Sequence, residues 1–299
     1  MQYKVSVVIS SFNYAHFIGE TIESIVKQTY PAYEIIVVDD GSTDDSVEII
    51  KSYGERVRLI LQKNQGVCVA RNNGARKSTG DIIAFLDSDD AWRPQKLERQ
   101  VAAFESDAEV GLVSCGIRGF DPNGKTLYEY REGKSGWCAN EIILFEPVMN
   151  FTASALAVRR EVFEQSGGFD EQRELYAAED REFCYRVAKQ SKMLFVPEVL
   201  VDYRVHGGNG HLNIRRMEHA TELVLEKIFG RADDETLKLK RRAYGGLYST
   251  MAGSHFQVGD YAAFLKSAFK TLWLTPSKFW YFANFPSRLL KRKVSGFIK

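Results

Sequence analysis

A buried strand that runs directly into a cluster of carboxylates is the feature that most constrains this chain. The apolar run 82–86 follows Gly80 and leads into the segment 87–90, Asp-Ser-Asp-Asp. An uninterrupted apolar run is typical of a central strand covered on both faces, as in a parallel α/β sheet. Carboxylates this close repel one another, so a cleft that holds them needs a cation. A hard divalent ion, Mg²⁺ or Mn²⁺, is suitable because it prefers one or two carboxylates together with diphosphate oxygens.

An isolated Asp-x-Asp is more often a solvated acidic turn, so the surrounding pattern has to decide. Segments 4–9, 34–38 and 57–61 predict three earlier strands, and residues with helical periodicity separate them. Ser42 and Asp45 have the spacing of a capping box that begins the second helix. Strands that alternate with helices form βαβ units, whose parallel sheet binds ligands at the carboxyl ends of its strands. The sequence therefore predicts an α/β fold with its polar clusters at one edge.

Seven short motifs carry a family resemblance. In order, they are 7–13 (VVISSFN), 23–31 (ESIVKQTYP), 37–44 (VVDDGSTD), 70–72 (ARN), 86–90 (LDSDD), 167–171 (GGFDE) and 179–183 (EDREF). The series resembles family 2 glycosyltransferases of the GT-A fold, covers about two thirds of the chain, and is more specific than any single motif. The resemblance implies a Rossmann-like, mostly parallel sheet flanked by helices that binds a nucleotide-sugar.

The resemblance assigns four residues to the nucleotide. Asp39, at the end of the second strand, would accept a hydrogen bond from the base, because a carboxylate only accepts and a pyrimidine imide or guanine edge offers N–H. Ser10 and Phe12 lie where the family holds base and ribose, and Arg71 matches a position that contacts the nucleotide. For Asp39, and for its neighbour Asp40, capping of the following turn is the alternative.

The resemblance also implies a metal site. Asp87 and Asp89 would bind a divalent ion that bridges two phosphates, with Asp89 the direct ligand and Ser88 part of the nucleotide site. Such an ion stabilises the charge that develops on a departing nucleoside diphosphate. Relatives place a histidine after a Tyr-Arg strand, here His206, where it completes the metal shell or meets the diphosphate; a surface position is the alternative. Arg204 is a further candidate helper at this site, with the same alternative.

Direct displacement at the anomeric carbon also needs a base on the far side of the sugar. Asp180 is our candidate, because it lies at the start of a predicted helix, where a carboxylate can face a cleft, and such a base contributes about 10²–10⁴ in rate. The alternative is that Glu179 and Asp180 only stabilise a helix N-terminus. Glu179 and the aromatic Trp137 are further candidates for contact with the acceptor.

The length of 299 residues is sufficient for one α/β domain at 1–210 with further chain to follow. Within that domain we expect 1–109 to bind the donor and 110–210 the acceptor, with a hairpin at 121–124. Helical periodicity from 211 onward predicts a C-terminal helical region, 211–299, that ends in a basic and aromatic tail.

The tail has an unusual charge. From Tyr261 to the end there are eight basic and no acidic residues, interleaved with aromatic side chains. This mixture predicts a peripheral contact of 276–299 with an anionic membrane, and a packed terminal helix with solvated lysines is the alternative. No nucleic-acid partner is expected, because the enzymatic half offers no basic groove.

Cysteine spacing and hydropathy bear on location. The four cysteines lack C-x-x-C spacing, which predicts neither a disulfide framework nor a zinc site. The N-terminus lacks the pattern of a signal peptide, and no apolar segment reaches the about 20 residues that span a bilayer. We therefore expect a cytoplasmic protein, peripheral on the inner face of the cell membrane if the tail binds lipid.

Together these features predict an inverting glycosyltransferase of hexosyltransferase type. It would move one sugar from a nucleoside diphosphate sugar, with UDP favoured, to a hydroxyl of a glycan or lipid-linked saccharide in polysaccharide biosynthesis. Two alternatives stay open: a nucleotidyltransferase, although the basic, glycine-rich phosphate loop of that class is absent near residue 10, and a catalytically inactive nucleotide-sugar-binding module. A dehydrogenase is disfavoured because no G-x-G-x-x-G follows the first strand.

Overall fold

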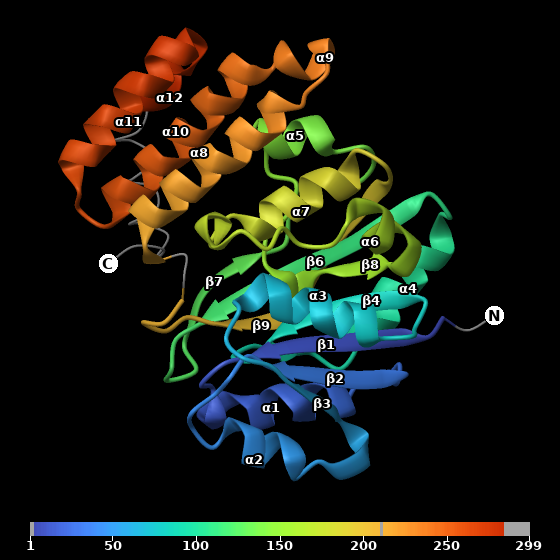
Figure 1. The fold of residues 1–299 in the computed structure, drawn as a ribbon. Coiled ribbons are helices and arrows are strands. Elements are labelled where there is room, and N and C mark those ends of the chain that lie inside the picture. The colour runs from blue at the N-terminus through green and yellow to red at the C-terminus, as the bar shows by residue number, and fades with distance from the viewer. Residues whose placement is uncertain (1–2, 210–211, 284–299) are drawn as a thin grey trace. The chain divides into compact units, whose positions relative to one another are not determined.

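The computed structural model describes residues 3–209 and 212–283, which group into two compact units (Figure 1). The first unit consists of Met1–Ala139, Pro147–Arg173 and Glu179–His206. The second consists of Asn140–Glu146, Glu174–Ala178 and Gly207–Lys299. The predicted boundaries at 109 and 210 stay predictions.

The first unit is built on one mixed sheet of nine strands among the described residues, in the order β3-β2-β1-β4-β8-β6-β9-β5, with β7 paired to β6 (Figure 1). The strands are β1 (Val5–Ser11), β2 (Glu34–Asp39), β3 (Arg58–Leu61), β4 (Ile82–Asp87), β5 (Ala91–Trp92), β6 (Val110–Phe120), β7 (Thr126–Tyr130), β8 (Ala157–Arg159) and β9 (Lys192–Arg204). Strands β3, β2, β1 and β4 are parallel, as is the pair β6 and β9. Antiparallel pairs enter through β8, β7 and β5.

Helices cover both faces of this sheet. They are α1 (Ala15–Val26), α2 (Ser46–Lys51), η1 (Gly54–Arg56), α3 (Val67–Lys77), α4 (Lys96–Ser106), η2 (Ala153–Ala155), α6 (Arg160–Ser166) and α7 (Glu179–Ala188). Because side chains alternate along a strand, one set of β1 and β2 residues packs in a core with α1, α2 and α4, and the other set meets α3. Helix α3 approaches closely, since a Cβ on Gly74 would collide with Val8. The predicted GT-A type sheet flanked by helices is confirmed.

Two local predictions have different outcomes. The hairpin at 121–124 is confirmed, because Gly124 has φ +79° and its N–H donates to the Asp121 carbonyl at 2.9 Å between β6 and β7. The capping box of Ser42 and Asp45 is wrong. Helix α2 begins at Ser46 without a side-chain cap, and the Ser42 hydroxyl donates instead to Oδ2 of Asp39 at 2.6 Å. The Ser42 oxygen accepts instead from the backbone N–H of Asn13 at 2.9 Å, so it does not cap α2.

The second unit is helical, which confirms the predicted C-terminal helical appendage. The helices outside the first list are α5 (Ala139–Ile143), η3 (Arg173–Leu175), α8 (Ile214–Gly230), α9 (Asp234–Leu237), α10 (Lys240–Gln257), α11 (Tyr261–Leu274), η5 (Pro276–Lys278) and α12 (Phe279–Ala283). Buried polar groups tie α8 to α10, including His255 with Glu218 at 3.1 Å and Tyr248 with Glu222 at 2.6 Å. Within the described residues, no helix has the length and apolar content needed to cross a bilayer.

Candidate functional site

The carboxyl ends of β1, β2 and β4 lie level with one another. In the sheet register, Ser11 of β1 is opposite Asp39 of β2, and Ser10 is opposite Asp87 of β4. Ser10 and Asp39 are buried, whereas Phe12, just beyond β1, is exposed. The strand ends that the sequence analysis singled out therefore form one edge, as a parallel sheet requires.

Arg71 of α3 is the centre of this edge. Its Nη2 lies 2.6 Å from Oδ1 of Asp87, and its Nη1 lies 3.1 Å from Oδ1 of Asp180 and 3.6 Å from Oε1 of Glu179. The side chain is only 4% exposed, so its charge has to be met by these carboxylates. Burial by itself would lower the pKa of Arg71, but Asp87, Asp180 and Glu179 hold it well above the usual value. Arg71 thus joins the acidic strand end to the candidate base.

Asp180 is held in place by both of its carboxylate oxygens. Oδ1 faces Arg71, and Oδ2 accepts a hydrogen bond from the backbone N–H of Ala153 at 3.0 Å. Burial raises the pKa of Asp180, Arg71 lowers it, and Glu179 and Asp87 raise it, with a result of about 8. A carboxylate with a pKa near the working pH can exchange a proton during a reaction.

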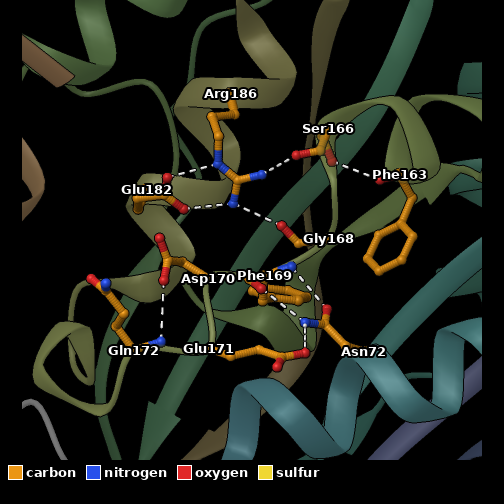
Figure 2. A network of polar contacts seen from close by, with 10 residues as sticks. All are labelled: Asn72, Phe163, Ser166, Gly168, Phe169, Asp170, Glu171, Gln172, Glu182 and Arg186. Atoms are coloured by element: carbon orange, nitrogen blue, oxygen red, sulfur yellow. Dashed lines mark hydrogen bonds and ion pairs between the residues drawn. The ribbon is translucent and has the colours of Figure 1, made fainter. Parts of the chain in front are cut away.

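The Gly167–Glu171 motif acts as a clamp between α3 and α7, as Figure 2 shows. Asn72, next to Arg71, donates to the Phe169 carbonyl at 2.8 Å and accepts from the Phe169 N–H at 2.8 Å. On the other side, Arg186 of α7 donates to the Gly168 carbonyl at 2.7 Å and pairs with Glu182. Gly168 has φ +76°, and a Cβ there would crowd Asn72. Because α7 carries Asp180, the clamp holds Asp180 at a defined distance from Arg71.

Asp89 meets His206 at the end of β9. Nε2 of His206 lies 2.9 Å from Oδ2 of Asp89, and the imidazole packs against the rings of Tyr14 and Phe17 at centroid distances of 5.8 and 5.5 Å. Arg204 is buried and supports the acidic segment, since its Nε donates to the Asp89 carbonyl at 2.9 Å. Two residues predicted as metal ligands are therefore in contact.

The side chains near Asp89 fit a divalent ion that takes some of its ligands from the protein and the others from a bound substrate. Across residues 3–209 and 212–283, no three His, Cys, Asp or Glu side chains are grouped as a metal site. Mg²⁺ usually binds through one or two carboxylates together with phosphate oxygens and needs no cage made wholly of protein. Asp89 and His206 suit that arrangement, whereas Asp87 is already paired with Arg71. The ligand roles of Asp87, Asp89 and His206 stay predictions.

Sequence reasoning missed Ser154 of η2. Its hydroxyl donates to Oδ2 of Asp90 at 2.5 Å and accepts from the Asp87 N–H at 3.1 Å, while the neighbouring Ala153 N–H bonds Asp180. Asp90 in turn accepts from the Arg204 N–H at 2.9 Å. Burial, followed by Asp89 and Asp87, raises the pKa of Asp90 well above its usual value. No motif in the sequence marks Ser154, because it lies 64 positions from Asp90.

The adjacent acids at the end of β2 hold loops. Asp39 accepts from the N–H groups of Gly41 and Ser42 at 3.2 and 2.8 Å. Asp40 accepts from the N–H groups of Gln65 and Gly66, both at 2.8 Å, directly before α3. Turn capping, the alternative considered for both acids, is therefore present for Asp39, whereas Asp40 bonds the segment before α3 instead of the turn that follows it. The capping occupies part of the acceptor capacity of Asp39, whose contact with a base stays a prediction.

The remaining predicted residues lie in two settings. Ser88 is buried, and its carbonyl accepts from the Thr21 hydroxyl at 3.0 Å, so it fixes the acidic segment against α1. Trp137 is 55% exposed beside Gly136, which bridges to Met193. The acceptor roles of Trp137 and Glu179 stay predictions.

Sequence comparison identifies related proteins. The model of the family described as glycosyl transferase family 2 matches residues 6–167. An uncharacterized glycosyltransferase of a Nostoc species is 34% identical over 229 residues, which are 70% of this chain and 67% of that protein. The putative teichuronic acid biosynthesis glycosyltransferase TuaG of Bacillus subtilis is 42% identical over 101 residues, which are 32% of this chain and 40% of TuaG.

Solved structures share the fold. S. aureus TarS 1-349 in complex with UDP-GlcNAc aligns with a TM-score of 0.67 at 18% identity, over 92% of this chain and 82% of that one. The mannosyltransferase PcManGT of Pyrobaculum calidifontis, in complex with GDP-Man and Mn²⁺, aligns with a TM-score of 0.63 at 20% identity, over 94% of this chain and 83% of that one. At these identities the likeness concerns the fold alone.

Proposed function

We propose a reaction for this chain, which belongs to glycosyl transferase family 2 and is a transferase. It moves one sugar from a nucleoside diphosphate sugar to a hydroxyl, with inversion at the anomeric carbon. The observation that carries the proposal is the guanidinium of Arg71, which holds Asp87 and Asp180 within 2.6 and 3.1 Å. The acidic strand end and a carboxylate with a raised pKa then belong to one site, as donor binding and proton removal require.

In this reaction Asp180 is the base. It accepts the proton of the acceptor hydroxyl as that oxygen attacks the anomeric carbon and the bond to the diphosphate breaks. Arg71 and the Ala153 N–H fix the carboxylate in orientation, so the proton acceptor is positioned before substrate arrives. Glu179 pairs with the same guanidinium, so it shares the positive charge of Arg71 with Asp180 and in this way assists the base.

Asp89 and His206 would hold Mn²⁺ or Mg²⁺, and Asp87 would be a further ligand. Arg204 supports the acidic segment through its hydrogen bond to the Asp89 carbonyl. When bound, the ion would neutralise charge on the departing diphosphate. The Mn²⁺ present with the fold relative PcManGT supports this choice of cofactor.

UDP is the nucleotide that we favour in the donor, with Ser10, Phe12 and Asp39 around its nucleoside, and the UDP-GlcNAc bound to TarS supports that choice. The acceptor is a glycan or lipid-linked saccharide in polysaccharide biosynthesis. The description of TuaG as a putative teichuronic acid biosynthesis glycosyltransferase supports this choice. Contact of 276–299 with a membrane remains part of the proposal, although residues 284–299 lie outside the described residues. The expected cytoplasmic location stays a prediction.

A thermal-shift panel tests the donor site. The unfolding midpoint is measured with UDP, GDP and dTDP, each with and without Mn²⁺, on the wild type, Asp89→Asn and the surface control Asp107→Asn. A ligand that binds only the folded state stabilises it by about 2.7 kcal/mol at a hundred times its Kd. We expect a Mn²⁺-dependent shift with UDP in the wild type and control, which Asp89→Asn loses. Absence of a shift with every nucleotide would refute donor binding.

A further inference from the structure

Helix α11 exposes its large apolar side chains and buries its small polar ones. Tyr261, Leu265, Phe269 and Trp273 are 59, 64, 69 and 72% exposed, whereas Ser267 and Thr271 are buried. Residues four apart lie on the same side of a helix, so these four form one continuous apolar surface, which we call the α11 stripe. A globular protein ordinarily turns such a stripe inward.

The orientation of α11 follows from its close packing on α10. The buried residues Ser267 and Thr271 are small, and at the end of the helix a Cβ on Gly245 of α10 would collide with Thr275. Small side chains let two helices approach closely, and the large ones are then left outside.

Polar contacts hold this orientation. Lys270 lies 3.5 Å from Oε1 of Glu222 and 4.0 Å from the centre of the Tyr248 ring. Arg241 donates to the carbonyls of Trp273 and Leu274 at 2.9 and 2.8 Å. Rotation of α11 to bury the stripe would break these contacts, so the exposure of the stripe is built into the unit.

The charge of the segment 261–299, taken from the sequence, selects the partner of the stripe. Lys266 is exposed on α11, and the chain from Tyr261 to Lys299 contains eight basic residues and no acidic ones. A second copy of this chain, docked through the same segment, would bring the same basic charge. The residues after 283 are themselves basic by sequence, so they too do not offer the opposite charge. An anionic lipid surface offers both the apolar interior and the opposite charge.

We propose that the α11 stripe docks on an anionic lipid bilayer, with α11 lying in the plane of the interface. Tyr261 and Trp273, at the two ends of the stripe, are residue types that prefer the headgroup level. The docking surface lies before the predicted tail contact at 276–299 and is independent of the donor site. Its failure would therefore leave the proposed transfer reaction untouched.

Vesicle flotation with the full chain tests the docking. Vesicles of phosphatidylcholine with phosphatidylglycerol are compared with vesicles of phosphatidylcholine alone, for the wild type, Phe269→Glu, Trp273→Glu and Lys266→Glu. Leu237→Glu, on the exposed side of α9 in the same unit, is the control. We expect the wild type and control to float with anionic vesicles only. Phe269→Glu and Trp273→Glu should weaken partitioning by roughly tenfold or more, the equivalent of losing one buried large apolar side chain.

Lys266→Glu keeps the proposal testable if an apolar replacement unfolds the unit, because it changes only a solvated charge. It should also weaken binding to anionic vesicles, and added salt should reduce the difference from wild type. Equal flotation of all variants, or no flotation of the wild type, overturns the proposal. Light scattering that shows a wild-type dimer, split into monomers by Trp273→Glu, would also overturn it by assigning the stripe to a second copy.

Discussion

The guanidinium of Arg71 lies 3.1 Å from Oδ1 of Asp180, although 109 positions separate the two residues. The same group bonds Asp87 at 2.6 Å, so one cation is shared by the acidic strand end and the candidate base. A change of charge on either carboxylate is therefore felt by the other. This coupling is the basis of the first two predictions.

Asp180→Asn should lower kcat by about 10²–10⁴ while donor binding is retained, because the amide keeps the size of the side chain and cannot accept the proton. Turnover with a nucleotide-sugar panel and the UDP-dependent thermal shift measure the two effects separately. Asp107→Asn changes a partly exposed acid that is paired with Lys192, and as the control it should retain wild-type values. Full turnover in Asp180→Asn would exclude Asp180 as the base.

The rate should rise with pH toward the pKa of Asp180, which is about 8. Below that pH the carboxyl holds its proton and cannot act as a base, and above it the rate levels off. Arg71 lowers this pKa, so Arg71→Gln should move the inflection of the kcat profile to higher pH.

The same pKa has a consequence for stability. Between the ordinary value of 3.8 and about 8, the folded state binds the proton more tightly than the unfolded state. The contribution of Asp180 to stability is therefore present below pH 3.8 and lost as pH rises through about 8.

The pH dependence of the rate has its own contradicting outcome. A kcat profile without an inflection above pH 6, measured with donor saturating, would contradict the role of Asp180 as the base.

Ser154→Ala should reduce turnover while the overall fold persists. The substitution removes the hydroxyl that bonds Asp90 at 2.5 Å and the Asp87 N–H at 3.1 Å, which leaves Asp90 with one hydrogen bond fewer at a cost of about 1–3 kcal/mol. Ser191→Ala, which removes a buried hydroxyl far from these acids in sequence, is the matched control. Equal losses of stability with turnover unchanged in Ser154→Ala would show that Ser154 does not position the site.

Lys96→Met should stabilise the protein near neutral pH. Lys96 is fully buried, with Nζ 2.7 Å from Oε1 of Gln100 and 3.7 Å from the centre of the Trp92 ring. Burial lowers the pKa of Lys96 from 10.5 to about 7, so between these values the unfolded state binds a proton that the folded state does not. Stability then rises with pH over this window.

The gain on substitution should be about 1–3 kcal/mol near pH 7 after the loss of the Gln100 contact, and smaller near pH 9.5. Urea unfolding at the two pH values measures the difference. A pH dependence that is the same in wild type and Lys96→Met would show that Lys96 is not its source.

Several features of the fold were predictable because they depend on local pattern. Largely apolar runs become β1, β2 and β4, which are buried over all or nearly all of their length, because a sheet covered on both faces accommodates them. Gly124 ends a turn at positive φ, which the sequence Asp-Pro-Asn-Gly at 121–124 predicts. Likewise, the order of the motifs was sufficient for the family.

Choices between partners were not predictable. Asp39, Ser42 and Asp45 offer several hydrogen-bonding patterns of similar local merit, and the capping box was the wrong one. The outcome depends on Asn13, whose backbone N–H donates to the Ser42 hydroxyl at 2.9 Å from 29 positions away. Sequence spacing carries no information about a donor that a neighbouring strand supplies.

The sequence by itself determined which polar strand ends lie together, since parallel strands bring their carboxyl ends to one edge whatever the loops do. Only the tertiary structure decided which atoms meet there: Arg71 with Asp180, and His206 with Asp89 across 117 positions. It also decided that α11 turns its aromatic side outward. Contacts between separate elements depend on how side chains of given volume pack, and that is a property of the whole fold that no local pattern contains.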